Sequence, residues 1–163
     1  MLLGNKVKST VAVSLPRPPI SHILLAWLGS STAIAAVVML GKLSGYPWIL
    51  GSFGASCVLL FGFPDAAFSQ PRNLILGHFL CSLIGLSFLN FLGPDWWSMA
   101  LAVGTALATM MFFRSVHPPA GSNPVIIFLT QPDWLFLWFP TVAGTLVLFC
   151  LSRLFLTITR KFR

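Results

Sequence analysis

The chain has 163 residues, of which 56% are hydrophobic and only 8% are charged, and its net charge is +7. Soluble domains carry roughly 25% charged residues, so this composition excludes a protein with a water-soluble surface. It also argues against nucleic-acid binding, because the basic residues lie mostly at the termini and between apolar runs, where positive charge orients a membrane protein.

The N-terminal residues 1–19 form a polar, proline-rich segment that leads into the first apolar run, residues 20–40. Basic residues precede this run, and Ala33-Ile34-Ala35 within it mimics a signal-peptide cleavage site. The run is longer than the core of a signal peptide, and further apolar runs follow it. We therefore interpret it as a retained transmembrane helix.

Three later apolar runs, residues 74–92, 96–113 and 135–151, also come near the ~20 residues that cross a bilayer as a helix. The chain closes on a basic tail, residues 157–163. The sequence therefore predicts a single all-α, polytopic membrane domain with four full transmembrane helices.

Two breaks rich in glycine, serine and proline interrupt this pattern. We expect the first to be extended chain over residues 46–53 followed by a short helix over 54–63, and the second to be extended over 117–122 followed by a helix over 123–130. Extended backbone at membrane depth is tolerated only where it is buried in protein or lines a watery cavity. The other helices must therefore enclose both breaks.

Either break is long enough to cross the membrane, since six extended residues and eight helical ones span about 30 Å. The alternative is that both are re-entrant, which leaves four crossings. With six crossings and the N-terminus inside, nine of the ten basic residues lie on the cytoplasmic side, whereas four crossings place Arg114 outside. The positive-inside rule therefore favours six.

The two halves, residues 20–92 and 96–156, each read as helix, broken segment, helix. Six crossings would run these halves through the membrane in opposite directions, and such an inverted repeat is a common transporter plan. The two short helices would then begin near the midplane, where their unpaired N–H groups attract anions.

Small and polar residues of the two breaks are the candidate binding site. Ser122 or Asn123 can cap the helix that follows, and Pro124 suits its first turn. The alternative interpretation is a purely structural break with small-residue helix packing. The predicted substrate-binding residues are Ser52, Gly54, Ala55, Ser56, Gly121, Ser122 and Asn123.

Two histidines and two arginines are further candidates. His78 and His117 are candidates for gating or proton coupling, because ionisable residues inside a membrane are usually functional, although each could instead hold a helix or loop in place. Arg72 and Arg114 could attract anions to the inner mouth, or could serve only as orientation charges at helix ends. Four glycines are expected to let helices approach closely: Gly77, Gly85, Gly104 and Gly144.

No pattern in the sequence indicates an enzyme, a metal or a cofactor. The three cysteines lie in apolar segments without metal-ligand or redox spacing. No Walker loop, dinucleotide fingerprint, zinc motif or catalytic triad is present. We therefore predict no catalytic residues, no metal and no cofactor.

Three motifs in order carry a family resemblance: residues 51–56 (Gly-Ser-Phe-Gly-Ala-Ser), Gln70-Pro71-Arg72-Asn73 followed by Gly77-His78, and residues 115–121 (Ser-Val-His-Pro-Pro-Ala-Gly). Over roughly residues 48–153 the chain resembles the HPP family of integral membrane proteins. Members from cyanobacteria and chloroplast envelopes are associated with nitrite transport, and the family is usually described as having four transmembrane helices. The resemblance implies a cyanobacterial-type inner membrane or a chloroplast envelope as the location. The distribution of basic residues predicts that both termini lie on the cytoplasmic or stromal side.

These observations together predict transport of a small monovalent anion, with nitrite as the leading candidate, through a midplane site between the two breaks. The alternative is a non-transporting membrane scaffold or accessory subunit. The sequence leaves open nitrite against nitrate or formate, channel against proton-coupled carrier, and the formation of a homo-oligomer.

Overall fold

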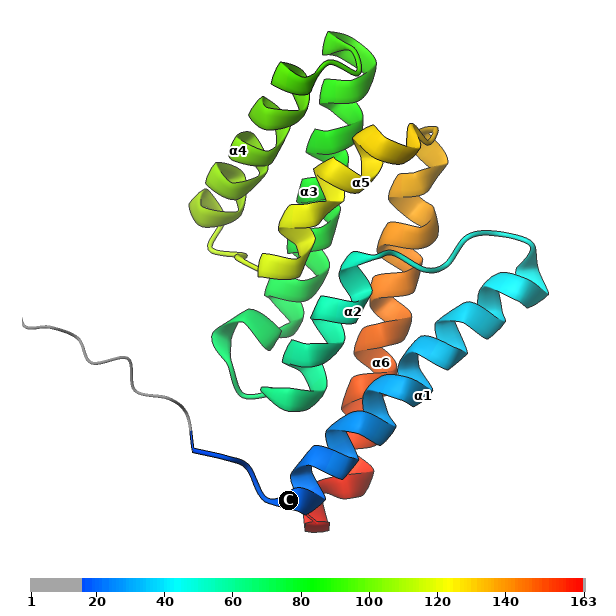
Figure 1. Cartoon of the computed structure of the whole chain (residues 1–163), viewed down its shortest axis with the longest axis vertical. Helices are drawn as coiled ribbons and strands as arrows, with labels where there is room; N and C mark the ends of the chain where they lie inside the picture. The colour runs from blue at the N-terminus through cyan, green and yellow to red at the C-terminus, as the bar shows by residue number, and fades with distance from the viewer. Residues whose placement is uncertain (1–15, 163) are drawn as a thin grey trace, which may run out of the picture.

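The regular elements in residues 16–162, the part of the chain that the computed structural model describes, are all helices (Figure 1). Most of the N-terminal segment 1–19 and the last residue of the basic tail lie outside the described residues. The all-α prediction is confirmed for the part described.

Four long helices form the frame: α1 (Ile20–Ser44), α3 (Pro71–Leu92), α4 (Trp96–Phe112) and α6 (Ala143–Thr159). Two short helical segments, η4 (Trp134–Leu137) and η5 (Trp138–Val142), extend α6 into one apolar stretch of 26 residues. Three helices of the described chain are long and apolar enough to cross a membrane, namely α1, α3 and this extended α6. With 17 residues, α4 is about 25 Å long and falls short of the length expected for it.

The first break contains a short helix that begins earlier than predicted. Residues 45–51 are not helical, α2 spans Ser52–Cys57, and the π-helical segment η1 continues it over Val58–Gly62. The helix starts at Ser52 rather than at residue 54 because Gly51 already has helical backbone angles and the Phe53 N–H donates to the Leu50 carbonyl.

The second break is helical where extended chain was expected. The 3₁₀ helix η3 (Pro118–Ser122) runs directly into α5 (Asn123–Thr130). A 3₁₀ turn satisfies backbone groups locally, which extended chain at this depth would leave unpaired. The predicted cap at Ser122 is wrong, because its hydroxyl donates backwards to the Pro119 carbonyl at 2.8 Å.

Successive segments run back and forth between two ends of the bundle (Figure 1). One side of the bundle, called here the turn end, holds the chain reversals at residues 93–95 and 131–133 at the top of the view and the reversal at residues 45–47 lower, at the right edge. Ring contacts join its parts, with Phe91 and Trp134 centroids 6.5 Å apart and Tyr46 and Phe139 centroids 5.8 Å apart.

The opposite end, called here the tail end, holds the start of α1, the end of α6 and the linker between η1 and α3 (Figure 1). Asp65 of this linker shares a groove of about 340 Å³ with Arg153 and Arg160 of the C-terminal segment. Arg72 at the start of α3 donates to the Phe113 carbonyl at 2.8 Å, which ties the end of α4 to the same region.

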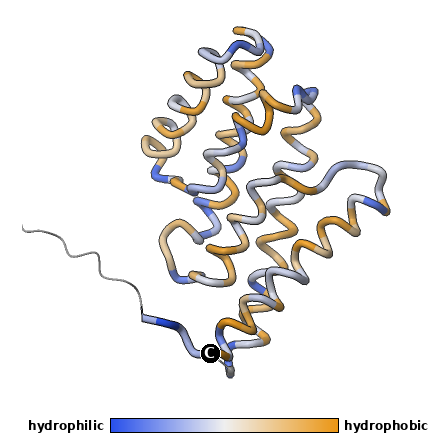
Figure 2. Tube along the Cα trace, viewed as in Figure 1, coloured by the Kyte–Doolittle hydropathy of each residue, from blue (hydrophilic) through white to orange (hydrophobic). Residues whose placement is uncertain are grey.

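Hydrophobic residues run along every long helix (Figure 2), and many of the large ones are exposed. Leu43 and Phe112 are 78% and 81% exposed, and large aliphatic and aromatic residues on every long helix share this exposure. Contiguous apolar surface of this extent does not occur on a soluble monomer and suits contact with lipid.

Three of the four predicted packing glycines lie at close helix contacts. A Cβ atom at Gly77 would come within 2.9 Å of the His117 Cβ, and one at Gly85 within 2.9 Å of the Pro124 Cα. At Gly144 it would come within 2.6 Å of the Phe53 ring. Gly104 faces open space, because α4 presents that side outward, so its predicted packing role is wrong.

Candidate functional site

A buried cluster of three polar side chains lies where α2, α3 and the second break meet. The Ser56 hydroxyl is 3.0 Å from Nε2 of His78 and 3.0 Å from Nε2 of His117, and the two imidazole rings are 5.1 Å apart. All three residues are fully buried. Residues separated by as many as 61 positions thus form one hydrogen-bonded unit.

The partners of the outer ring nitrogens fix the direction of these hydrogen bonds for neutral imidazoles. His117 must donate from Nδ1 to the Phe68 carbonyl, 2.7 Å away, so its Nε2 accepts from Ser56. The Asn123 amide nitrogen donates to Nδ1 of His78 at 3.1 Å, so Nε2 of His78 donates to Ser56. The donors therefore point in one direction, from Asn123 through Ser56 to Phe68.

The network continues from Asn123 towards the turn end. The second hydrogen of the Asn123 amide is donated to the Ser82 hydroxyl at 2.9 Å, and Ser82 lies 3.0 Å from the Thr141 hydroxyl on η5. Hydrogen bonds therefore connect polar side chains through the core, from α2, α3, both parts of the second break and η5.

The close approach of the second break to α3 builds this cluster. Gly77 and Gly85 leave no Cβ in the way of His117 and Pro124, so η3 and α5 lie directly on the α3 backbone and carry Asn123 to His78. On the other side, the Phe53 ring packs edge-on against His78 with centroids 5.4 Å apart.

The structure brings together part of the predicted site. Ser56, His78, His117 and Asn123 are bonded to one another, and Ser52 is buried one turn before Ser56 on α2. Gly54, Ala55 and Ser122 are exposed and Gly121 is half-buried, so these four lie outside the cluster. On α2, Gly54 lies two positions from both Ser52 and Ser56, and Ala55 directly precedes Ser56. Residues one or two positions apart do not face each other on a helix.

Local turns take up part of the N–H groups that the sequence suggested as anion donors at the starts of the short helices. The Asn123 N–H is bonded to the Ala120 carbonyl, Pro124 has no N–H, and the Phe53 N–H is bonded to Leu50. Tight turns precede both short helices and occupy these donors. The chemistry of the site therefore comes from side chains.

Arg72 and Arg114 lie outside the cluster. Both are exposed, and the Arg72 guanidinium is held by the Phe113 carbonyl at the tail end. Arg114 has a left-handed backbone, with φ of 50°, at the reversal that follows α4.

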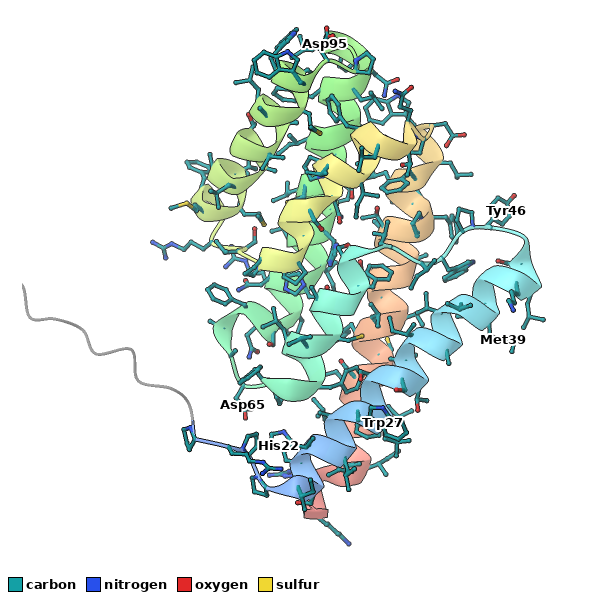
Figure 3. All side chains as sticks on the ribbon, in the orientation of Figure 1. His22, Trp27, Met39, Tyr46, Asp65 and Asp95 are labelled. Carbon is teal, nitrogen blue, oxygen red and sulfur yellow. The ribbon has the colours of Figure 1, made fainter. Side chains whose placement is uncertain are left out.

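No carboxylate accompanies the two histidines in the described part of the chain. Asp65, Asp95 and Asp133 are all exposed, and Asp65 and Asp95 lie at opposite ends of the molecule (Figure 3). The described residues also include no group of three or more His, Cys, Asp or Glu that could hold a metal ion. A positive charge on the cluster would therefore have no built-in counter-charge.

Sequence reasoning missed two hydroxyl residues of the network, Ser82 and Thr141, and the buried but unbonded hydroxyl of Thr145. Each is buried in an apolar helix, where a hydroxyl usually bonds to its own backbone. The available signal was spacing, since Ser82 follows His78 by one turn and Thr145 follows Thr141 by one turn.

Comparison with known proteins gives the family. The family model described as "HPP, transmembrane region" matches residues 15–163. The chain belongs to the HPP family. Its location in a membrane as a multi-pass protein follows from this membership and from the apolar spans.

Two transmembrane proteins of Dictyostelium discoideum are similar to this HPP family chain. Each is 30% identical to it, over 158 residues (90% of this chain and 55% of the relative) and over 159 residues (89% and 50%). The chain thus spans about half the length of these curated relatives. No solved structure matches this HPP family chain.

Proposed function

We propose that this protein carries a small monovalent anion, nitrite first among the candidates, across the membrane together with a proton. The observation that carries the proposal is the fully buried Ser56 hydroxyl held between two imidazoles. Ionisable residues at membrane depth are costly and mark ion or proton pathways. Here two histidines are joined through one serine hydroxyl where the two breaks meet, and this arrangement suits a substrate site.

The absence of a carboxylate near the histidines in the described residues favours coupled binding of an anion and a proton. A lone charge of either sign is expensive in the membrane core. An anion that binds with a proton leaves the site neutral. Coupling also removes the electrical cost of nitrite uptake against a negative-inside potential, about 2.3 kcal/mol per 100 mV.

The transport proposal includes six membrane crossings arranged as an inverted repeat. The linker with Asp65 lies beside Arg153 and Arg160, at the same end as the end of α6, which supports full crossing by α2 and its preceding chain. A re-entrant first break would put that linker at the turn end. The short α4 is compatible with six crossings where the bilayer thins locally.

Flux measurements with the purified chain in liposomes test the proposal. We expect nitrite uptake that is stimulated by an inwardly directed proton gradient and is lost in Ser56→Ala, His78→Gln and His117→Gln. Ser87→Ala is the matched control, because Ser87 lies on α3 but its hydroxyl bonds only to the Leu83 carbonyl of its own helix. Wild-type liposomes without nitrite flux, or full flux in all three cluster variants, would contradict the proposal.

A scaffold or accessory subunit is the second candidate, and tight packing favours it. Ser56, His78, His117 and Asn123 are each fully buried, as expected where a polar network merely holds a bundle together. This function predicts that the cluster variants lose stability while the wild-type chain carries no solute.

A further inference from the structure

Besides the hydroxyl of Ser115, two residues before His117, three polar atoms around the cluster are buried without a hydrogen-bond partner. They are the Ser52 hydroxyl, the Asn123 amide oxygen and the Thr145 hydroxyl, and their residues are 3%, 0% and 1% exposed. Buried polar groups are nearly always paired, and an unpaired one costs free energy. Three from different elements in one core are available to hydrogen-bond a ligand or water.

Helical register brings these atoms to the same two levels of the core. His78 and Ser82 are one turn apart on α3, Ser52 and Ser56 are one turn apart on α2, and Thr141 and Thr145 are one turn apart on the α6 stretch. Both α2 and α6 run antiparallel to α3 (Figure 1).

The hydrogen bonds then assign each unpaired atom to one of these two levels. Ser56 bonds to His78, so Ser52 lies at the level of Ser82. Thr141 bonds to Ser82, so Thr145 lies at the level of His78. Asn123 bonds to both His78 and Ser82 and therefore spans the two levels. Along the bundle axis, the unpaired atoms thus fall within about one helical turn, ~5.4 Å, of one another.

The types of these atoms specify the ligand. Ser52 and Thr145 each offer a hydroxyl donor, whereas the Asn123 oxygen can only accept. Both hydrogens of the Asn123 amide are already donated, to His78 and to Ser82, so this oxygen is the part of Asn123 that is left for a ligand. A bare anion, which only accepts, would be repelled by it.

We propose that Ser52, Asn123 and Thr145 bind the substrate as a small neutral monoprotic acid, with two acceptor contacts to the hydroxyls and one donated proton to the Asn123 oxygen. The anion and proton of the proposed function, on which this inference rests, then occupy the site as one molecule. Nitrous and formic acid have this pattern. Nitrate, the anion of a strong acid, does not hold the proton and is rejected.

The neutral acid also fits the hydrogen-bond directions of the cluster. In its neutral form, each imidazole already has a hydrogen-bond partner for both nitrogens, in the chain of bonds that begins at Asn123 and ends at the Phe68 carbonyl. The proton taken up with the anion stays on the ligand oxygen, so neither histidine needs to be charged while the substrate is bound. The proton leaves with the anion on the other side.

Thr145 and Thr141 provide a matched test. Both are 1% exposed and lie one turn apart, but the Thr141 hydroxyl is bonded to Ser82 and the Thr145 hydroxyl has no partner. Thermal unfolding of the purified full chain in nanodiscs is followed at pH 6 with nitrite, formate or nitrate. We expect nitrite and formate, but not nitrate, to raise the wild-type midpoint.

The variants separate ligand contact from structural support. We expect Thr145→Val to keep the ligand-free midpoint and to weaken nitrite binding at least threefold, with Ser52→Ala acting in the same direction. We expect Thr141→Val to lower the ligand-free midpoint and to keep the nitrite-induced rise. Formamide, a neutral molecule with both a donor and an acceptor, should compete with nitrite in wild type and fail to bind Thr145→Val.

If the wild-type chain binds and carries nitrite, two results overturn this inference without affecting the proposed function. One is unchanged nitrite binding in Thr145→Val, and the other is a wild-type midpoint raised as much by nitrate as by nitrite. The first is also the result expected if water fills the three positions. A wild-type chain that neither binds nor carries nitrite overturns the proposed function and this inference together.

Discussion

Ser56 has one hydroxyl hydrogen and two acceptors within reach. One acceptor is Nε2 of His117 at 3.0 Å, and the other is the Ser52 carbonyl of its own helix at 3.1 Å. The hydrogen can therefore turn from one to the other without movement of heavier atoms. If a proton passed through His117, rotation of the Ser56 hydroxyl alone would adjust the hydrogen bonds to it. Ser56 is therefore suited to a site where protons bind and leave.

Removal of this hydroxyl should destabilise the fold. Ser56→Ala leaves Nε2 of His78 and Nε2 of His117 buried without partners. Such a loss lowers the free energy of unfolding by about 1–3 kcal/mol. A loss of about 2 kcal/mol lowers the unfolding midpoint by roughly 4–8 °C for a chain of this length. Differential scanning fluorimetry in detergent measures this shift. A midpoint equal to that of Ser87→Ala would mean that the bridge carries no stability.

At the scale of elements, the second break lies on α3 because two glycines admit it. Gly77→Ala would place a methyl group 2.9 Å from the His117 Cβ and 3.1 Å from the Ser115 carbonyl, neither of which is the free end of a flexible side chain. We expect a loss of about 1–3 kcal/mol from this overpacking, with nitrite flux reduced because His117 moves away from Ser56.

Gly104→Ala is the control for this substitution. Gly104 lies within α4, and an added Cβ there would meet no atom within 4 Å beyond its own helix backbone and chain neighbours. Alanine should therefore leave the free energy of unfolding unchanged or raise it by up to ~1 kcal/mol through helix propensity. Thermal unfolding and liposome flux of the two variants, measured side by side, check the pair. Equal midpoints would show that the α3 contact tolerates a methyl group.

The bounds of the elements were partly predictable from the residues. Pro124 and the Gly121-Ser122 pair before it predicted the start of α5 at residue 123, and the structure has it there. The start of α2 was misplaced because the local pattern of Gly51-Ser52-Phe53-Gly54 does not reveal that Leu50 accepts a bond from Phe53. The residues that favour a turn could be recognised in the sequence, whereas a single backbone hydrogen bond at the start of a helix could not be predicted from it.

The candidate site was predictable only as two separate groups of residues. Each break and each histidine could be selected from polarity in an apolar context, but nothing in the spacing of Ser56, His78 and His117 predicts that one hydroxyl joins both rings. Thr141 and Thr145 gave no signal as isolated hydroxyls. Pairing across helices depends on tertiary packing, which a single sequence does not encode in its local pattern.

At the scale of the whole molecule, coupled transport predicts indifference to the membrane potential. An anion moving alone would respond to 100 mV with about 2.3 kcal/mol, a change in equilibrium accumulation of roughly 40-fold. An anion moving with a proton should respond to the pH difference and not to the voltage. Nitrite accumulation in liposomes clamped with valinomycin at different potassium gradients measures this. A strong voltage dependence at zero pH difference would indicate an uncoupled channel.

The six-crossing arrangement also determines which loops share a side of the membrane. Asp65 lies at the tail end beside Arg153 and Arg160, whereas Asp95 and Asp133 follow the reversals at the turn end. In sealed vesicles of one orientation, a membrane-impermeant maleimide should therefore label Asp95→Cys and Asp133→Cys from one side and Asp65→Cys only from the other. The wild-type chain, whose own cysteines lie in apolar helices, gives the background. Two re-entrant breaks would instead place Asp65→Cys on the same side as Asp133→Cys and Asp95→Cys on the opposite side, so the three variants together distinguish six crossings from four.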